Sequence, residues 1–131
     1  MKPGDTLAAW RFGPIDADAM RTLADVLNDP NPIHLDPDAV RAAGLGERVI
    51  NQGPANLAYI INMLESNELE IKTLEARFTG NVCAADIVEA RGAVSGADPD
   101  GIPCEFSLTL EDGATAIAGS ALCTRAPDEA S

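Results

Sequence analysis

The ten-residue stretch NDPNPIHLDP, positions 28–37, holds the residues best suited to chemistry. It contains His34, the only histidine of the chain, five residues after Asp29. A carboxylate and an imidazole exchange protons near neutral pH, so the pair is a candidate for general acid–base catalysis. The prolines between and around them restrict the backbone. The same residue types are common in ordinary turns, so this stretch alone leaves a structural role open.

Four elements are expected in the first half of the chain. Residues 6–12 have the composition of a strand and end at a Gly-Pro pair. Residues 16–27 have helical spacing of apolar positions behind an aspartate that can cap the helix. A short helix is expected over 36–43, starting with Asp-Pro. Residues 54–64 form an almost entirely apolar pattern, which is typical of a buried helix.

The second half of the chain changes to a strand-like period. Asp112-Gly113 is a strong hairpin signal between the last two segments. Short links between consecutive strands imply an antiparallel sheet. The four predicted strands are 71–80, 85–96, 102–111 and 114–125.

This order of elements predicts a single α+β domain. An apolar helix of about four turns needs a surface that buries it, and a curved antiparallel sheet wrapped around it would do so. That arrangement is the hot-dog fold. The domain is expected to span residues 1–126, and residues 127–131 are expected to be a disordered C-terminal tail.

The net charge of −12, from 21 acidic and nine basic side chains, restricts the partners. Nucleic acid and anionic membrane surfaces are disfavoured, because binding them needs clustered lysines and arginines. An anionic small molecule is still allowed, since a few well-placed arginines hold a phosphate locally.

The three cysteines have no CxxC spacing and are odd in number, which argues against disulfides and a zinc site. Each lies in an apolar, strand-like context, so we expect Cys83, Cys104 and Cys123 to be buried as small hydrophobic residues. The N-terminus lacks the apolar core of a signal peptide, and no run reaches transmembrane length. A soluble, cytoplasmic protein is expected.

The segment from Asp29 to His34 fits the pattern D-x-N-P-[LIV]-H and thereby resembles the MaoC-like dehydratases, which include the R-specific enoyl-CoA hydratases. The continuation HLDPDAV is similar to the HLDP-x-F-A run of that family. Phe78 and Asp86 lie near the family's F…G-D positions. The resemblance extends over almost the whole chain.

The resemblance implies a hydro-lyase that adds water to a trans-2-enoyl-CoA to give an (R)-3-hydroxyacyl-CoA, or catalyses the reverse dehydration, within fatty acid metabolism. It assigns acid–base catalysis to Asp29 and His34. It assigns the backbone N–H of Gly53, at the start of the central helix, to the thioester oxyanion, and Asn31 to support of the loop. It implies neither a metal nor a cofactor.

The chain departs from the family before the central helix, where Gln52-Gly53 replaces the usual His-Gly. Gln52 and Asn56 give this helix start its own character and are candidates for substrate binding, as is Arg77. Further candidates for the CoA phosphates are Arg41, Arg48, Lys72 and Arg91. A homodimer, or a heterodimer with a related hot-dog subunit, is expected.

Two other functions are compatible with the fold. A hot-dog acyl-CoA thioesterase would also use a carboxylate and a polarised thioester carbonyl. A non-catalytic acyl-CoA-binding subunit of a heteromeric hydratase would leave the chemistry to its partner. The intact Asp29 and His34 argue against the second alternative.

Overall fold

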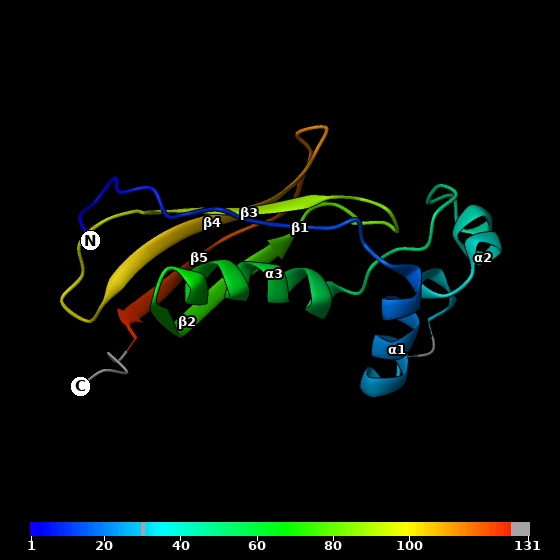
Figure 1. The fold of residues 1–131 in the computed structure, drawn as a ribbon, viewed down its shortest axis with the longest axis horizontal. Coiled ribbons are helices and arrows are strands. Elements are labelled where there is room, and N and C mark those ends of the chain that lie inside the picture. The colour runs from blue at the N-terminus through cyan, green and yellow to red at the C-terminus, as the bar shows by residue number, and fades with distance from the viewer. Residues whose placement is uncertain (30, 127–131) are drawn as a thin grey trace.

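The computed structural model describes residues 1–29 and 31–126 (Figure 1). The expected tail, 127–131, lies outside the described residues. In chain order the elements are β1 (Trp10–Phe12), α1 (Ala17–Leu27), the 3-10 helix η1 (Pro32–His34), α2 (Pro37–Ala42), α3 (Gly53–Ser66), β2 (Leu69–Phe78), β3 (Val88–Val94), β4 (Ile102–Leu110) and β5 (Thr115–Arg125).

Local sequence accounts for where the two shorter α-helices begin. The Asp16 side chain accepts the N–H of Asp18 at the start of α1, and Asp36 does the same for Asp38 at the start of α2. Asn28 ends α1 in the left-handed conformation, with φ of 51°. Both predicted helices are therefore confirmed to within about two residues.

The five strands form one antiparallel sheet in the order β1-β3-β4-β5-β2. β4 and β5 are joined through Asp112-Gly113, as the hairpin signal predicts. β2 does not pair with β3, the next strand along the chain, but with β5 at the far side of the sheet. The chain from 79 to 87 therefore crosses the sheet to reach β3.

Helix α3 lies along one face of this sheet, and α1 and α2 lie beyond its N-terminal end (Figure 1). Ile60, Met63 and Leu64 of α3 are fully buried against the sheet. Their partners are the inward-facing side chains of the strands, among them Val88, Ala90, Cys104, Leu108 and Ile117. The expected hot-dog arrangement of a sheet around a central apolar helix is confirmed.

The first strand is shorter than predicted. Of residues 6–12, only the last three belong to β1, and Thr6 makes an isolated bridge to Ala93. Similarly, β3 begins at Val88 and not at residue 85. A turn precedes it, in which the Asp86 carboxylate accepts the N–H of Cys83 at 2.8 Å and Ala85 has a φ of 73°.

That turn also corrects the expectation for the cysteines. Cys104 and Cys123 are fully buried in strands, and burial raises the pKa of Cys123 to about 12. They fill the core as small hydrophobic residues. Cys83 lies outside the strands and is partly exposed. Within the described residues, no helix is both long and apolar enough to cross a membrane.

Gly119 gives a test of the sheet packing. It lies in β5 opposite Ala76 of β2 and Phe106 of β4. A Cβ at this position would overlap the carbonyl oxygen of Glu75 and approach the Phe106 ring to 2.9 Å. We expect Gly119→Ala to lower the free energy of unfolding by about 2 kcal/mol or more in urea denaturation.

Gly96→Ala is the matched control, because its Cβ would meet only Pro103 at an ordinary contact distance of 3.8 Å. This variant should change stability by less than about 0.5 kcal/mol. Equal stability of the two variants would contradict the packing described for β5.

Candidate active site

The end of α1 positions Asp29. Its backbone N–H donates to the carbonyl of Ala24, five residues back, at 2.9 Å, and this bond closes the end of α1 across the left-handed Asn28. Its Oδ1 accepts the N–H of Asn31 at 3.2 Å. One carboxylate oxygen is thus held by the loop backbone, and Oδ2 is left to face another group.

Asn31 caps the 3-10 turn that carries His34. Its Oδ1 accepts the N–H of Ile33 at 3.2 Å, and the turn closes with Leu35 N–H donating to the Pro32 carbonyl at 3.0 Å. Two successive side-chain-to-backbone bonds, from Asp29 and Asn31, therefore set the path of the loop.

His34 is only 9% exposed, and its ring is fixed by a backbone carbonyl. Its Nδ1 lies 2.6 Å from the carbonyl oxygen of Ile50. Because a carbonyl oxygen only accepts, Nδ1 must carry the hydrogen. The Ile50 N–H in turn donates to the Ile33 carbonyl at 2.9 Å, so two bonds join this loop to the segment before α3.

The second ring nitrogen, Nε2, lies 3.4 Å from Oδ2 of Asp29. The side chain of His34 is 11% exposed and that of Asp29 is 36% exposed, so the pair is accessible from one side. When the ring is neutral, Nε2 and Oδ2 are two neighbouring acceptors. A single water molecule can donate one hydrogen to each of them. When the ring is protonated, the carboxylate stabilises it.

Gly53 begins α3 three residues after Ile50. Pro54 lacks an N–H, and no acceptor for the Gly53 N–H is found within the described part of the chain. The helix N-terminus also carries a partial positive charge. A Cβ on Gly53 would meet only the ring of Phe78, at 3.5 Å, and its φ is not positive. Neither strain nor packing therefore requires glycine here, and a methyl group would lie in ordinary contact with the Phe78 ring.

Gln52 directs its side chain into the protein. It is 1% exposed, and its Nε2 donates to the carbonyl of Met20 in α1 at 2.8 Å. Its Oε1 is buried without a hydrogen-bond partner among the described residues. The side chain does not cap α3, and instead ties the start of that helix to α1.

Asn56 belongs to a second buried polar cluster. The Asn51 Nδ2 donates to Asn56 Oδ1 at 2.9 Å and to the Tyr59 hydroxyl at 3.1 Å. Burial raises the pKa of Tyr59 above its usual value, and the bond from Asn51 partly opposes that shift. Asn51 and Tyr59 are not among the site residues that the sequence predicts. A lone tyrosine on an otherwise apolar helix was the available signal.

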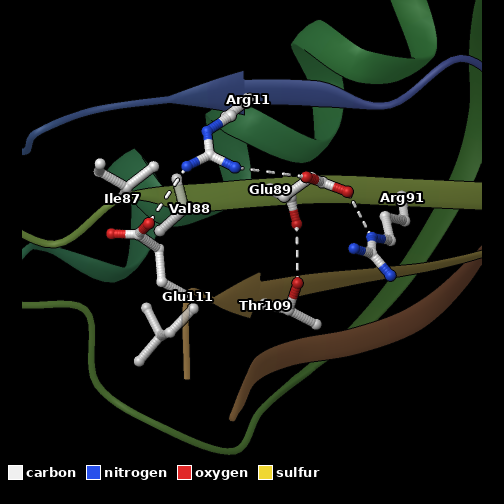
Figure 2. Close-up of a pocket in the computed structure, with 8 residues that line it drawn as sticks. Arg11, Ile87, Val88, Glu89, Arg91, Thr109 and Glu111 are labelled. Carbon is white, nitrogen blue, oxygen red and sulfur yellow. Dashed lines mark hydrogen bonds and ion pairs between the residues drawn. The ribbon is translucent and has the colours of Figure 1, made fainter. Parts of the chain in front are cut away.

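Several of the basic side chains considered for phosphate binding form ion pairs with acidic side chains. Arg41 pairs with Asp38, and Arg48 with Asp86 at 2.8 Å. Arg91 pairs with Glu89 on the outer face of the sheet, in the cluster drawn in Figure 2. That cluster also contains Arg11, whose guanidinium lies 3.2 Å from Glu111 and 4.0 Å from Glu89. Its two arginines are matched by two glutamates, so it offers no excess positive charge.

Arg77 differs from these residues, because it is exposed at the end of β2 and has no acidic partner within residues 1–29 and 31–126. Lys72 donates to the backbone carbonyl of Asp100.

Within residues 1–29 and 31–126, no group of three histidine, cysteine, aspartate or glutamate side chains is placed to hold a metal ion.

Solved structures share this fold over nearly the whole chain. The unliganded R-hydratase PhaJ1 from Pseudomonas aeruginosa has a TM-score of 0.82 at 19% identity, covering 98% of this chain and 84% of its own. The (R)-hydratase from A. caviae involved in PHA biosynthesis has 0.84 at 22%, covering 97% and 98%. The ChsH1–ChsH2 complex from Mycobacterium tuberculosis has 0.80 at 16%, covering 94% and 97%.

A comparison with curated proteins gives no match. The family described as MaoC like domain matches residues 2–103, a span that contains the Asp29–His34 loop, α3 and three of the five strands up to the start of β4. The chain therefore belongs to the MaoC-like domain family.

Proposed function

We propose that this protein is a hydro-lyase that adds water across the double bond of a trans-2-enoyl-CoA to give an (R)-3-hydroxyacyl-CoA, or catalyses the reverse dehydration. The observation that carries the proposal is the approach of His34 Nε2 to Asp29 Oδ2 at 3.4 Å, with Nδ1 fixed on the Ile50 carbonyl. Membership of the MaoC-like family and the R-hydratase fold neighbours support it.

The arrangement supports the following proton balance. A water molecule donates its hydrogens to Nε2 of His34 and Oδ2 of Asp29, and its oxygen adds to Cβ of the enoyl thioester. Nε2 takes one proton from the water as the carbon–oxygen bond forms. The imidazolium is stabilised by the Asp29 carboxylate and then returns that proton to Cα. Both catalytic groups end in the state in which they began.

Negative charge develops on the thioester oxygen while Cα awaits its proton. We assign the Gly53 N–H to that oxygen, because it is a donor at a helix N-terminus with no acceptor among the described residues. The Phe78 ring, 55% exposed, lies beside Gly53. We assign Arg77 to the CoA phosphates. Gln52 and Asn56 act on the substrate indirectly, by holding the start of α3 in place.

Asp29→Asn tests the acid–base pair. The amide keeps the size and the Asn31 N–H bond of the carboxylate but no longer stabilises an imidazolium. We expect hydration of crotonyl-CoA, followed by loss of enoyl absorbance, to fall by at least about 100-fold, with the unfolding free energy nearly unchanged.

His34→Ala should lose as much activity, and it should also lower the unfolding free energy by about 1–3 kcal/mol, because the Ile50 carbonyl loses its donor. Full turnover in either variant would refute the assignment. Release of free CoA by the wild type, measured with a thiol reagent, would indicate a thioesterase instead.

Gly53→Ala tests the oxyanion position. The added methyl group meets only the Phe78 ring at an ordinary distance, so the unfolding free energy should stay within about 1 kcal/mol of the wild type. The methyl group occupies the space beside the N–H, so kcat/KM for crotonyl-CoA should fall by roughly 10- to 100-fold.

Gly96→Ala should leave kcat/KM unchanged and serves as the control, since Gly96 lies in the connection between β3 and β4. A fully active, stable Gly53→Ala protein would remove Gly53 from the mechanism.

We further propose that the working form is a homodimer, or a heterodimer with a related hot-dog subunit. β2 is a ten-residue strand at the edge of the sheet, and an uncovered edge of this length invites pairing with another chain. The ChsH1–ChsH2 neighbour is itself a complex of two chains. The three free cysteines support placing this assembly in the reducing cytoplasm.

Analytical ultracentrifugation at micromolar concentration tests the assembly. A homodimer should sediment with about twice the 13.6 kDa mass of the chain. A single-chain mass would contradict the homodimer and direct attention to a partner subunit recovered by co-purification.

A further inference from the structure

A cavity of about 160 Å³ lies between α1, α3 and the end of β1. Met20 and Leu23 of α1, Ala55 and Tyr59 of α3, and Phe12 of β1 contribute to its wall. The wall is mainly apolar, and Asp16, which caps α1, is its one charged residue. A cavity of this size and apolar character holds a benzene-sized group, on the scale of roughly 150 Å³ known for such sites.

The aromatic side of the cavity is preformed. The Phe12 ring stacks on the Tyr59 ring with 5.1 Å between centroids and stacks on Trp10 at 5.5 Å. Phe12 nevertheless remains 43% exposed, so one part of this aromatic wall is open. An exposed apolar wall of fixed geometry favours an apolar ligand. Such a ligand covers the wall and releases water from it, and the protein does not have to rearrange.

One end of the cavity is polar. The Tyr59 hydroxyl accepts a hydrogen from Asn51, and its own hydrogen has no acceptor among the residues that the structure describes. Asn51 also lines the cavity. The ligand that fits is therefore mainly hydrocarbon and enters beside a polar group.

The cavity lies next to the backbone that holds the catalytic pair. Leu23, in its wall, precedes Ala24, whose carbonyl binds the Asp29 N–H at 2.9 Å. Asn51, at its polar end, follows Ile50, whose carbonyl binds His34. Each catalytic residue is thus bonded to the immediate neighbour of a residue that lines the cavity.

We infer that this cavity is the subsite for the distal part of the acyl chain, and that it takes apolar acyl groups of medium length, longer than a four-carbon chain. The inference rests on the proposed function, since it takes the thioester to react between Asp29 and His34. The chain beyond Cβ would then run along α1 into the space bordered by Phe12 and Tyr59.

Trp10 provides a readout that does not depend on catalysis. It is the only tryptophan of the chain, and it stacks on both aromatic residues of the cavity wall. Saturated acyl-CoAs lack the double bond and cannot be hydrated. We would titrate butyryl-CoA, octanoyl-CoA and free CoA into the full-length protein and follow Trp10 fluorescence to obtain dissociation constants.

The expected result is a dissociation constant at least roughly tenfold lower for octanoyl-CoA than for butyryl-CoA, since each additional buried methylene favours binding. Ala19→Phe places a benzene-sized side chain at the α1 wall of the cavity and should abolish this difference. Ala17→Phe is the matched control, because Ala17 is also exposed at the start of α1 but does not line the cavity. It should keep the wild-type preference.

Equal affinity of the wild type for the two acyl-CoAs would overturn the inference, and so would an undiminished preference in Ala19→Phe. Crotonyl-CoA hydration, measured on the same samples, separates this outcome from failure of the proposed function. A hydratase without chain-length preference refutes only the subsite. A protein that binds octanoyl-CoA through this cavity but hydrates nothing supports the subsite and refutes the hydratase.

Discussion

The hydrogen bond from His34 Nδ1 to the Ile50 carbonyl, at 2.6 Å, is the constraint on which the site depends. It fixes the tautomer, so that Nε2 faces Asp29 as an acceptor. It also joins the loop after α1 to the segment that leads into α3. The loop sequence alone determines neither the orientation of the His34 ring nor the position of the loop relative to Gly53.

The start of α3 is held by polar side chains in a protein whose core is otherwise apolar. Gln52 ties the helix to α1, and Asn51 ties it to Asn56 and Tyr59. The Gln52 Oε1, which has no partner among the described residues, costs about 1–3 kcal/mol by ordinary measures of buried polar groups. An apolar residue would avoid that cost but would not hold the helix to α1. The polar contact therefore stabilises the start of α3 less than an apolar contact would, but it makes the orientation of α3 relative to α1 more specific.

The sequence predicts the parts of this structure that local chemistry decides. Asp16 and Asp36 cap their helices, Asp112-Gly113 turns the last hairpin, and the loop from Asp29 to His34 is set by side-chain bonds to residues two positions away. The remainder depends on contacts distant in sequence. No local signal indicates that β2 pairs with β5, that Ile50 receives the His34 hydrogen, or that residues 83–86 form a turn. Every residue type has a backbone carbonyl, so no sequence motif indicates that the Ile50 carbonyl orients His34.

Charge limits how such a chain can recognise an anionic thioester. The net charge is −12, and Arg41, Arg48 and Arg91 are each paired with a carboxylate. At physiological ionic strength, charges more than roughly 8 Å apart are largely screened, so distant acidic residues neither attract nor strongly repel the ligand. In the proposed function, Arg77 is the local group that contacts a phosphate, and it provides one positive charge. In the proposed function, most of the binding free energy then comes from apolar burial and from directional bonds such as that of the Gly53 N–H. Of these, only apolar burial distinguishes one acyl group from another, because the thioester and the CoA phosphates are the same in every substrate.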